Sequence, residues 1–269
     1  MIPTLHYLEL STGVRLQYAE QGDPAGAPVV LLHGITDSWR SFELVMGHLP
    51  AGLRVLAISQ RGHGESDRPG SYRTRDFAAD AAAFIEAMKL ESALVVGHSM
   101  GSVNAMRLAI DRPDRVRGLV LAGAFAAFTT NAGVVEFYRT VIEPLRDPIE
   151  PAFAAEWQQS TLAQPVPPAF FETVVAETLK VPAAVWRAGF AGLLEDDFSA
   201  ELGRIAAPTL VVWGDLDSFS PREDRDRLVG EIRGSRLVSY AGAGHALHWE
   251  EPARFARDVA DFASGLGPR

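Results

Sequence analysis

The sequence contains no cysteine, which excludes disulfide bonds, thiolate nucleophiles and cysteine-ligated metals. Positive charge is also scarce, since 25 Lys and Arg stand against 34 Asp and Glu and the net charge is −9. Such an acidic chain is unsuited to binding nucleic acid or an anionic membrane surface. The sequence has neither a glycine-rich phosphate loop nor a nicotinamide fingerprint, so we expect no cofactor.

Two further absences concern location. Residues 1–6 lack the basic and apolar segments of a secretory signal, and no apolar run is long enough to span a bilayer. We therefore expect a cytoplasmic protein with no membrane contact, whose partner is a small molecule. The sequence leaves a monomer and a homodimer equally open.

The chain does contain enough apolar sequence for a sizeable core, because 47% of its 269 residues are hydrophobic. Residues 5–10 and 14–19 alternate between polar and apolar side chains, the pattern of an antiparallel hairpin. Short apolar runs predict further strands, buried on both faces, at 29–32, 54–58, 93–96, 119–121, 209–213 and 237–240. Helical patterns between the runs lie at 75–88, 102–110, 223–232 and 252–263. This alternation predicts a mostly parallel, doubly wound sheet of eight strands.

The alternation of predicted strands and helices stops between about residues 126 and 200. This stretch is rich in proline and carries short amphipathic segments, the clearest at 153–162, 169–179 and 183–194. We interpret it as a helical cap inserted after the sixth strand, which divides the chain into core residues 1–125, cap residues 126–200 and core residues 201–269. Because ligands bind beyond the carboxyl ends of parallel strands, the cap should cover the site.

The most informative motif is Gly97-His98-Ser99-Met100-Gly101, which lies between the predicted strand 93–96 and the predicted helix 102–110. A Gly-x-Ser-x-Gly sequence in this context predicts a sharp turn that strains the serine backbone and exposes its hydroxyl. The helix beginning just after Ser99 directs N–H groups and its positive dipole end toward that hydroxyl. Ser99 is therefore the predicted nucleophile.

A serine hydroxyl needs a base, which is most often a histidine oriented by a carboxylate. Of the seven histidines, His245 follows a glycine-rich loop at the end of the last predicted strand, on the same sheet edge as Ser99. We predict that His245 is the base and that His248 is structural. A His-x-x-His metal site is discounted because the sequence offers no third ligand.

The carboxylate should follow another strand end. The strand at 209–213 is followed by Asp215 and Asp217, and Asp217 lies far enough beyond the strand to reach a histidine. We assign Asp217 to the histidine and Asp215 to the turn. The order Ser99, Asp217, His245 is that of an α/β-hydrolase triad.

An oxyanion that develops on the substrate needs preorganised N–H donors. Met100, directly after the nucleophile, supplies the first predicted donor. The second is Ile35 in the His33-Gly34-Ile35 loop that follows the strand at 29–32. Gly34 would let the backbone approach the substrate, and His33 would brace the loop through hydrogen bonds.

Together these motifs resemble the α/β-hydrolase superfamily over essentially the whole chain. The resemblance rests on the oxyanion loop, the nucleophile elbow, the acid loop and the histidine loop, at 33–34, 97–101, 213–217 and 242–252. A further family loop at 60–66 is similar, although members usually carry an aspartate where this chain has Ser59. The resemblance implies an α/β-hydrolase fold, a Ser-His-Asp triad and no metal or other cofactor.

Several reactions occur on this fold. Relatives that cleave epoxides or haloalkanes use an aspartate nucleophile, so Ser99 argues against them. Serine members that cleave C–C bonds in ring-fission products typically carry a tryptophan after the catalytic histidine and a second glycine after the elbow, where this chain has Ala246 and Ser102. We predict a carboxylic-ester hydrolase. The alternatives are a C–C hydrolase, lactonase or perhydrolase with the same triad, and a ligand receptor without activity.

The predicted cap and its flanks are rich in aromatic residues, among them Phe128, Phe137, Phe153, Trp157 and Phe190. Individually such residues are most simply explained by packing, but together they suggest an apolar pocket for a small to medium ester. As lining residues we select Trp39, Phe125 and Trp186.

Overall fold

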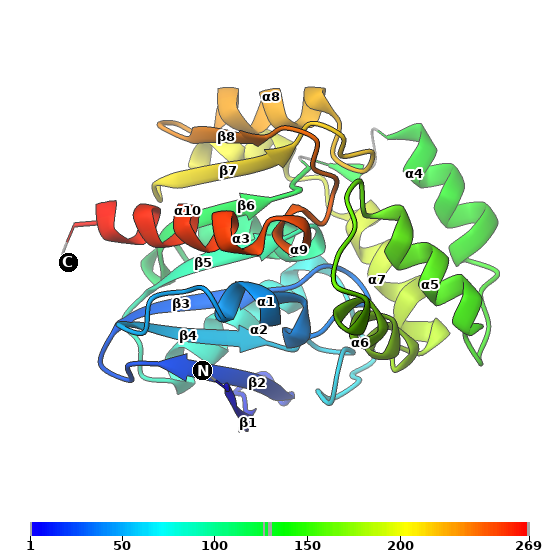
Figure 1. Cartoon of the computed structure of the whole chain (residues 1–269), viewed down its shortest axis with the longest axis horizontal. Helices are drawn as coiled ribbons and strands as arrows, with labels where there is room; N and C mark the ends of the chain where they lie inside the picture. The colour runs from blue at the N-terminus through cyan, green and yellow to red at the C-terminus, as the bar shows by residue number, and fades with distance from the viewer. Residues whose placement is uncertain (1, 126, 129–130, 268–269) are drawn as a thin grey trace.

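The core of the protein is a single twisted sheet of eight strands (Figure 1). It is seen in a computed structural model that describes residues 2–125, 127–128 and 131–267. The strands run in the spatial order β1-β2-β4-β3-β5-β6-β7-β8. Their bounds are β1 Thr4–Glu9, β2 Arg15–Gly22, β3 Ala27–Leu32, β4 Leu53–Ile58, β5 Ala93–His98, β6 Val116–Ala122, β7 Thr209–Gly214 and β8 Arg236–Tyr240.

Strand direction follows the sequence-based prediction. β1 pairs antiparallel with β2, and β2 pairs antiparallel with β4, whereas β3 to β8 pair in parallel. The predicted mostly parallel sheet of eight strands is confirmed. Because all six parallel-paired strands run the same way, their carboxyl ends share one edge of the sheet, and Ser99 follows β5 at that edge.

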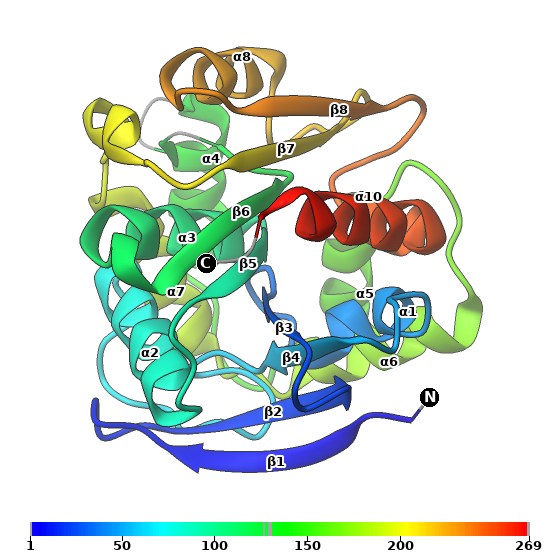
Figure 2. The same ribbon diagram turned by 90° about the vertical axis from the view of Figure 1, so that its left-hand side faces the viewer.

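Alternate residues of the central strands serve two separate hydrophobic layers. Leu32 and Val95 face a cluster that contains residues of α2 and α3, while Leu31 and Val96 face one that contains residues of α1 and α10. Figure 2 shows these helices on opposite sides of the sheet. A strand buried on both faces must be apolar at every position, which explains the continuous apolar runs in the sequence.

Among the described core helices, the four long ones lie where the periodicity predicts them, with ends that differ by one or two residues, whereas the four helices of three or four residues were not predicted. α3 starts earlier than predicted because Ser99 itself is the N-terminal cap residue. The core helices are η1 Trp39–Phe42, α1 Glu43–Met46, α2 Thr74–Ala87, α3 Met100–Asp111, η2 Pro113–Arg115, α8 Arg222–Glu231, α9 Leu247–Glu250 and α10 Pro252–Gly265.

The segment between β6 and β7 is the predicted helical insertion. It consists of α4 Ala132–Phe137, η4 Tyr138–Ile142, α5 Pro151–Ser160, α6 Pro168–Leu179, α7 Ala183–Glu195 and η5 Ser199–Arg204. α4 to α7 form a layer beyond the carboxyl ends of the strands (Figure 1). The predicted domain boundary at residue 126 lies outside the described residues.

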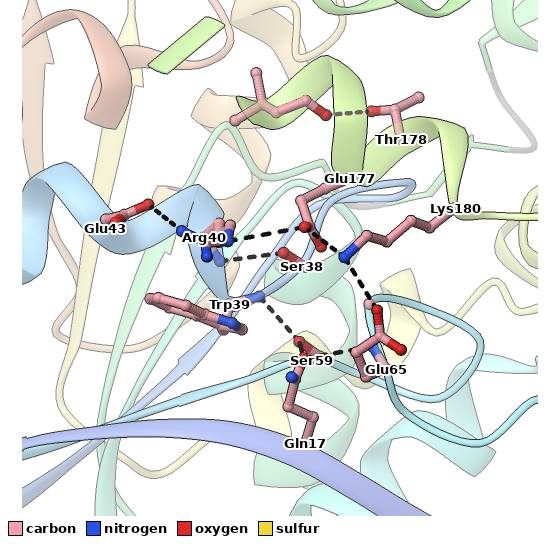
Figure 3. A network of polar contacts seen from close by, with 12 residues as sticks. Gln17, Ser38, Trp39, Arg40, Glu43, Ser59, Glu65, Glu177, Thr178 and Lys180 are labelled. Atoms are coloured by element: carbon pink, nitrogen blue, oxygen red, sulfur yellow. Dashed lines mark hydrogen bonds and ion pairs between the residues drawn. The ribbon is translucent and has the colours of Figure 1, made fainter. Parts of the chain in front are cut away.

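An ion-pair network attaches the cap to the core. The Glu177 carboxylate in α6 lies 3.8 Å from Arg40 in η1 and 2.8 Å from Lys180, which in turn contacts Glu65 in a core loop at 3.0 Å. Figure 3 shows Arg40 and Lys180 on either side of Glu177. Since the Glu177 side chain is buried, these contacts are less screened by salt than surface pairs.

Candidate active site

The turn between β5 and α3 holds Ser99 in a strained conformation. Its backbone has φ +52° and ψ −120°, in the left-handed region that side chains other than glycine rarely adopt. The Ser99 N–H donates to the carbonyl of Ala122 at 3.0 Å, which ties the turn to β6. The serine is thus presented at the carboxyl edge of the sheet, at the N-terminus of α3.

Both glycines of the elbow are required by the close approach of backbone. A Cβ atom added to Gly97 would lie 2.4 Å from the Gly101 carbonyl oxygen, and one added to Gly101 would lie 2.0 Å from the Leu32 carbonyl oxygen. Neither backbone oxygen can move aside without breaking the strand–helix packing. The spacing of the motif therefore has a steric cause.

Asp217 and His245, 28 positions apart in sequence, meet at the same edge. The imidazole Nδ1 lies 2.9 and 3.0 Å from the two carboxylate oxygens of Asp217, and both side chains are buried. Because the carboxylate accepts, Nδ1 donates, and in the neutral form of the ring Nε2 is then the acceptor. His245 and Ser99 line the same cavity.

The loops that carry these two residues are themselves held in place. Asp217 Oδ1 also accepts from the N–H groups of Phe219 and Ser220 at 2.8 and 2.9 Å. Asp215, in contrast, accepts from the Gly242 N–H at 2.6 Å and so secures the turn before His245. The two aspartates of the acid loop therefore have different contacts, one to the imidazole and one to the backbone.

The loop after β3 is braced by a buried histidine. The Gln60 N–H donates to His33 Nε2 at 2.9 Å, so the proton sits on Nδ1, which donates to the Gly34 carbonyl at 2.7 Å. Burial, together with the neighbouring His63, lowers the pKa of His33 well below its ordinary value and keeps the ring neutral. Ile35, which follows Gly34, lines the cavity.

Met100 directly follows Ser99 and is the first residue of α3. First-turn N–H groups have no acceptor within their own helix, so the Met100 N–H is available to a bound anion. The structure thus places the two predicted donors on separate elements, the β3 loop and the start of α3.

Helix α5 of the cap forms side-chain hydrogen bonds to two successive residues of the same loop. Trp157 Nε1 donates to Thr36 Oγ1 at 3.0 Å, and Gln158 Nε2 donates to Asp37 Oδ1 at 2.9 Å. Thr36 has φ +71°, a second strained non-glycine residue. The cap therefore helps to fix the loop that carries Ile35.

A cavity of about 450 Å³ lies between the cap and the sheet edge. Ser99, His245 and Ile35 form part of its floor. Its aromatic walls come from the cap, from the loop after β7 and from α9, and they comprise Phe128, Phe137, Phe153, Trp157, Phe190, Phe219 and Trp249.

The three residues predicted to line the pocket are not on the cavity wall, which corrects that prediction. Phe125 stacks behind Phe128 with ring centroids 3.5 Å apart, and Trp186 packs edge-on against Trp157 at 5.5 Å. Trp39 lies in the hydrophobic layer that contains α1 and α10. Each is buried among other side chains away from the cavity lining, a distinction that aromatic content alone does not make.

Asp37 is a cavity residue that the sequence reasoning missed. Its side chain is 4% exposed, and burial raises the pKa of its carboxyl to about 7. The hydrogen bonds from Gln158 and Ser41 act in the opposite direction and lower this pKa. The signal in the sequence was an acidic residue two positions after the predicted oxyanion donor, in an otherwise buried loop. Its partner Gln158 is 121 residues away, which no local pattern reveals.

His248 is not among the residues that line the cavity and contacts η1 instead. Its Nε2 lies 3.1 Å from Ser41 Oγ, and burial lowers its pKa to about 3, so the ring is neutral. In the part of the chain that the structure describes, no cluster of three or more His, Cys, Asp or Glu side chains is arranged to hold a metal ion. No helix among the described residues is long and apolar enough to cross a membrane.

The fold and the site geometry define an α/β-hydrolase. Residues 27–252 match the α/β-hydrolase fold family, and the chain belongs to that family.

Individual relatives align with this chain over nearly its whole length. AB hydrolase superfamily protein YisY of Bacillus subtilis is 31% identical over 96% of this chain and 99% of its own. The 2-hydroxymuconate semialdehyde hydrolase of Pseudomonas sp. is 32% identical over 94% of this chain and 92% of its own. Among solved structures, a thermophilic esterase from Thermogutta terrifontis aligns with a TM-score of 0.84 at 25% identity, covering 98% of this chain and 100% of that one.

Proposed function

We propose that the protein is a carboxylic-ester hydrolase that works through an acyl-enzyme on Ser99. The observation that carries this proposal is the hydrogen bond from His245 Nδ1 to the Asp217 carboxylate, at 2.9 Å, beside a cavity that Ser99 also lines. It leaves His245 Nε2 as the acceptor for the serine proton.

The reaction follows from this arrangement. Ser99 Oγ attacks the ester carbonyl carbon while its proton passes to His245 Nε2, and Asp217 stabilises the resulting imidazolium. The oxyanion accepts hydrogen bonds from the Ile35 and Met100 N–H groups. His245 then protonates the departing alcohol, and a water molecule, deprotonated by the same nitrogen, releases the acid.

Two observations favour a neutral ester as the substrate. The cavity walls are largely aromatic, which suits an uncharged acyl or alcohol group. The exposed Glu156 at the cavity wall would oppose a substrate carboxylate.

A second candidate is the cleavage of a C–C bond in a ring-fission product, which draws on the 32% identity to 2-hydroxymuconate semialdehyde hydrolase. Against it stand the two positions at which this chain departs from such enzymes. Ser102 donates to the carbonyls of Gly97 and Ala122 at 2.7 and 3.0 Å, and Ala246 is buried away from the cavity wall.

The direct test combines a substrate panel with the Ser99→Ala variant. We expect the wild type to hydrolyse p-nitrophenyl esters of short acids, and Ser99→Ala to lower kcat by roughly 10³-fold or more. A fluorophosphonate probe should label the wild type stoichiometrically and leave Ser99→Ala unlabelled. Ser264→Ala, at an exposed serine of α10, is the matched control and should keep wild-type turnover.

Normal ester turnover by Ser99→Ala would refute the assignment of the nucleophile. Turnover of a vinylogous diketone, with none of the esters, would favour the C–C candidate instead. No labelling and no turnover of any substrate would favour a ligand-binding role.

A further inference from the structure

The backbone on either side of His245 is hydrogen-bonded to the cap. The Ala246 N–H donates to the carbonyl of Thr161 at 3.0 Å. The Gln164 side chain donates to the carbonyl of Gly242 at 2.9 Å. Both cap residues lie between α5 and α6, in a segment that we call the cap loop (residues 161–164). The cap loop therefore contacts the chain immediately before and after the proposed base.

The Glu250 carboxylate, at the end of α9, joins the cap loop to the residue before His245. Its Oε2 accepts from the Gly244 N–H at 2.8 Å. Its Oε1 accepts from the N–H groups of Ala163 and Gln164 at 2.6 and 3.0 Å. Hydrogen bonds to an ionised acceptor are shorter and stronger than those to a neutral one. One side chain therefore holds three backbone donors, two from the cap and one from the core.

The cap loop and the backbone before His245 are also in close contact. A Cβ atom added to Gly244 would lie 2.7 Å from the Ala163 nitrogen and 2.9 Å from the Thr161 carbonyl oxygen. Neither segment belongs to a helix or a strand, so no regular backbone pairing fixes their separation. Individual hydrogen bonds set it instead, and three of these are to the Glu250 carboxylate.

The backbone of His245 is tied to the nucleophile turn as well. Its carbonyl accepts from Nε2 of His98, the residue before Ser99, at 3.0 Å. Because His245 Nε2 must receive the proton of Ser99 Oγ, a shift of this backbone moves the base relative to the nucleophile. A misplacement of about 1 Å can lower the rate of an enzyme by about 10²-fold.

We propose that Glu250 is a positioning residue, which holds the backbone of His245 against the cap loop so that Nε2 stays within reach of Ser99 Oγ. The inference rests on the proposed esterase function and deepens it. Glu250 is not among the residues that line the cavity, so it acts through His245 and not on the substrate. Its loss should therefore change kcat and leave KM nearly as it is.

The variant Glu250→Gln tests this role because it keeps the size of the side chain but replaces one acceptor oxygen by an NH2 group. At least one of the three N–H groups then loses its acceptor. For p-nitrophenyl acetate we expect kcat to fall by about 10-fold and KM to stay within about twofold of the wild type. Glu251→Gln is the matched control. It removes the same charge from the next residue, which pairs with Arg254 at 3.3 Å, and should keep the wild-type kcat and KM.

A double-mutant cycle separates an action through His245 from a general loss of structure. In a His245→Ala background there is no base to position, so adding Glu250→Gln should change the residual turnover by less than about twofold. A further fall of about 10-fold in that background would show that Glu250 acts elsewhere and would overturn the proposal. Circular dichroism establishes that each variant is folded.

A second variant tests the proposal should Glu250→Gln fail to fold. Gln164→Ala changes an exposed side chain of the cap loop and removes its hydrogen bond to Gly242. We expect kcat to fall by about threefold, as for the loss of one neutral hydrogen bond. Gln159→Ala, at an exposed position of α5, is its control and should behave as the wild type.

The outcomes that contradict the proposal are distinct from those that contradict the esterase function. Wild-type kcat in Glu250→Gln, or in Gln164→Ala where Glu250→Gln does not fold, would overturn the positioning role and leave the esterase assignment intact. A rise in KM at constant kcat would also overturn it, because the cap loop would then shape the cavity and not the position of His245. Failure of the wild type on every ester, with Ser99 unlabelled by the fluorophosphonate, would refute the esterase function and this inference with it.

Discussion

At the scale of single residues, the site concentrates features that a stable core would avoid. Ser99 and Thr36 have positive φ angles, and Asp37 buries a carboxyl group. Such features cost stability and persist where the surrounding structure holds them. Here they lie within the two loops that carry the proposed nucleophile and an oxyanion donor.

The buried carboxyl of Asp37 predicts a pH dependence of stability. Burial raises its pKa from 3.8 to about 7, partly offset by Gln158, Ser41 and His245, with Glu177 acting in the same direction as burial. Between pH 4 and 7 the folded state therefore binds a proton that the unfolded state has released, so stability falls as pH rises through this range. Asp37→Asn should remove this loss, and its melting temperature should exceed that of the wild type increasingly from pH 5 to pH 8.

Thermal unfolding of both proteins across this range measures the effect. The control is Glu156→Gln, which makes the same change at an exposed carboxyl and should track the wild type. A constant difference in melting temperature between Asp37→Asn and the wild type at all pH values would show that Asp37 does not titrate there.

At the scale of elements, the notable contact is between a cap helix and the loop that carries Ile35. α5 donates two side-chain hydrogen bonds to Thr36 and Asp37, next to Ile35. The cap therefore does more than cover the cavity. It helps to set the position of an N–H group whose direction matters for an oxyanion.

Trp157→Phe isolates one of these hydrogen bonds, because it keeps an aromatic ring but loses the donor to Thr36 Oγ1. We expect kcat for a p-nitrophenyl ester to fall by roughly 10-fold with a smaller change in KM, as for the loss of a transition-state contact. Trp186→Phe is a matched control, since Trp186 packs against Trp157 and its buried Nε1 has no partner among the described residues. Similar kcat values for the two variants would show that the hydrogen bond to Thr36 has no catalytic effect.

At the scale of the whole molecule, the cap and the core are joined through a few polar residues as well as by aromatic packing. Glu177 is central, because it pairs with Lys180 just beyond the end of its own helix and with Arg40 in the core. Its side chain is buried, whereas Arg40 and Lys180 are 35% and 40% exposed, so removing the charge of Glu177 removes two partly screened ion pairs. The cap therefore depends on this cluster for part of its attachment.

Glu177→Gln keeps the shape of the side chain and removes its charge. We expect a loss of about 1 kcal/mol in the free energy of unfolding, seen as a fall of roughly 2–4 °C in melting temperature. Glu172→Gln, at an exposed position of the same helix, has the same effect on net charge and should change the melting temperature little. Equal melting temperatures for the two variants would contradict a stabilising role of the cluster.

Much of this architecture could be predicted from the sequence because its causes are local or steric. Buried parallel strands must be apolar on both faces, so β3 to β7 are visible as continuous runs. The elbow requires glycine at 97 and 101 because backbone oxygens lie where a Cβ would be. The short helices, among them α4 and η4 of the cap, were missed, since segments of three to six residues carry too little periodicity.

The candidate site likewise has parts that the local sequence predicts and parts that it does not. Ser99 is identified by its own turn, and the loops of Asp217 and His245 by the strands that precede them, because chain direction brings these strand ends to one edge. Only the tertiary structure decided which aromatic side chains face the cavity and which lie away from its lining. The pairing of Asp37 with Gln158 likewise joins residues 121 positions apart. The sequence by itself therefore determined the fold and the chemical groups at the sheet edge, through local periodicity and backbone sterics. The shape and polarity of the cavity were decided by how the cap packs on the core, a long-range fit that no local pattern encodes.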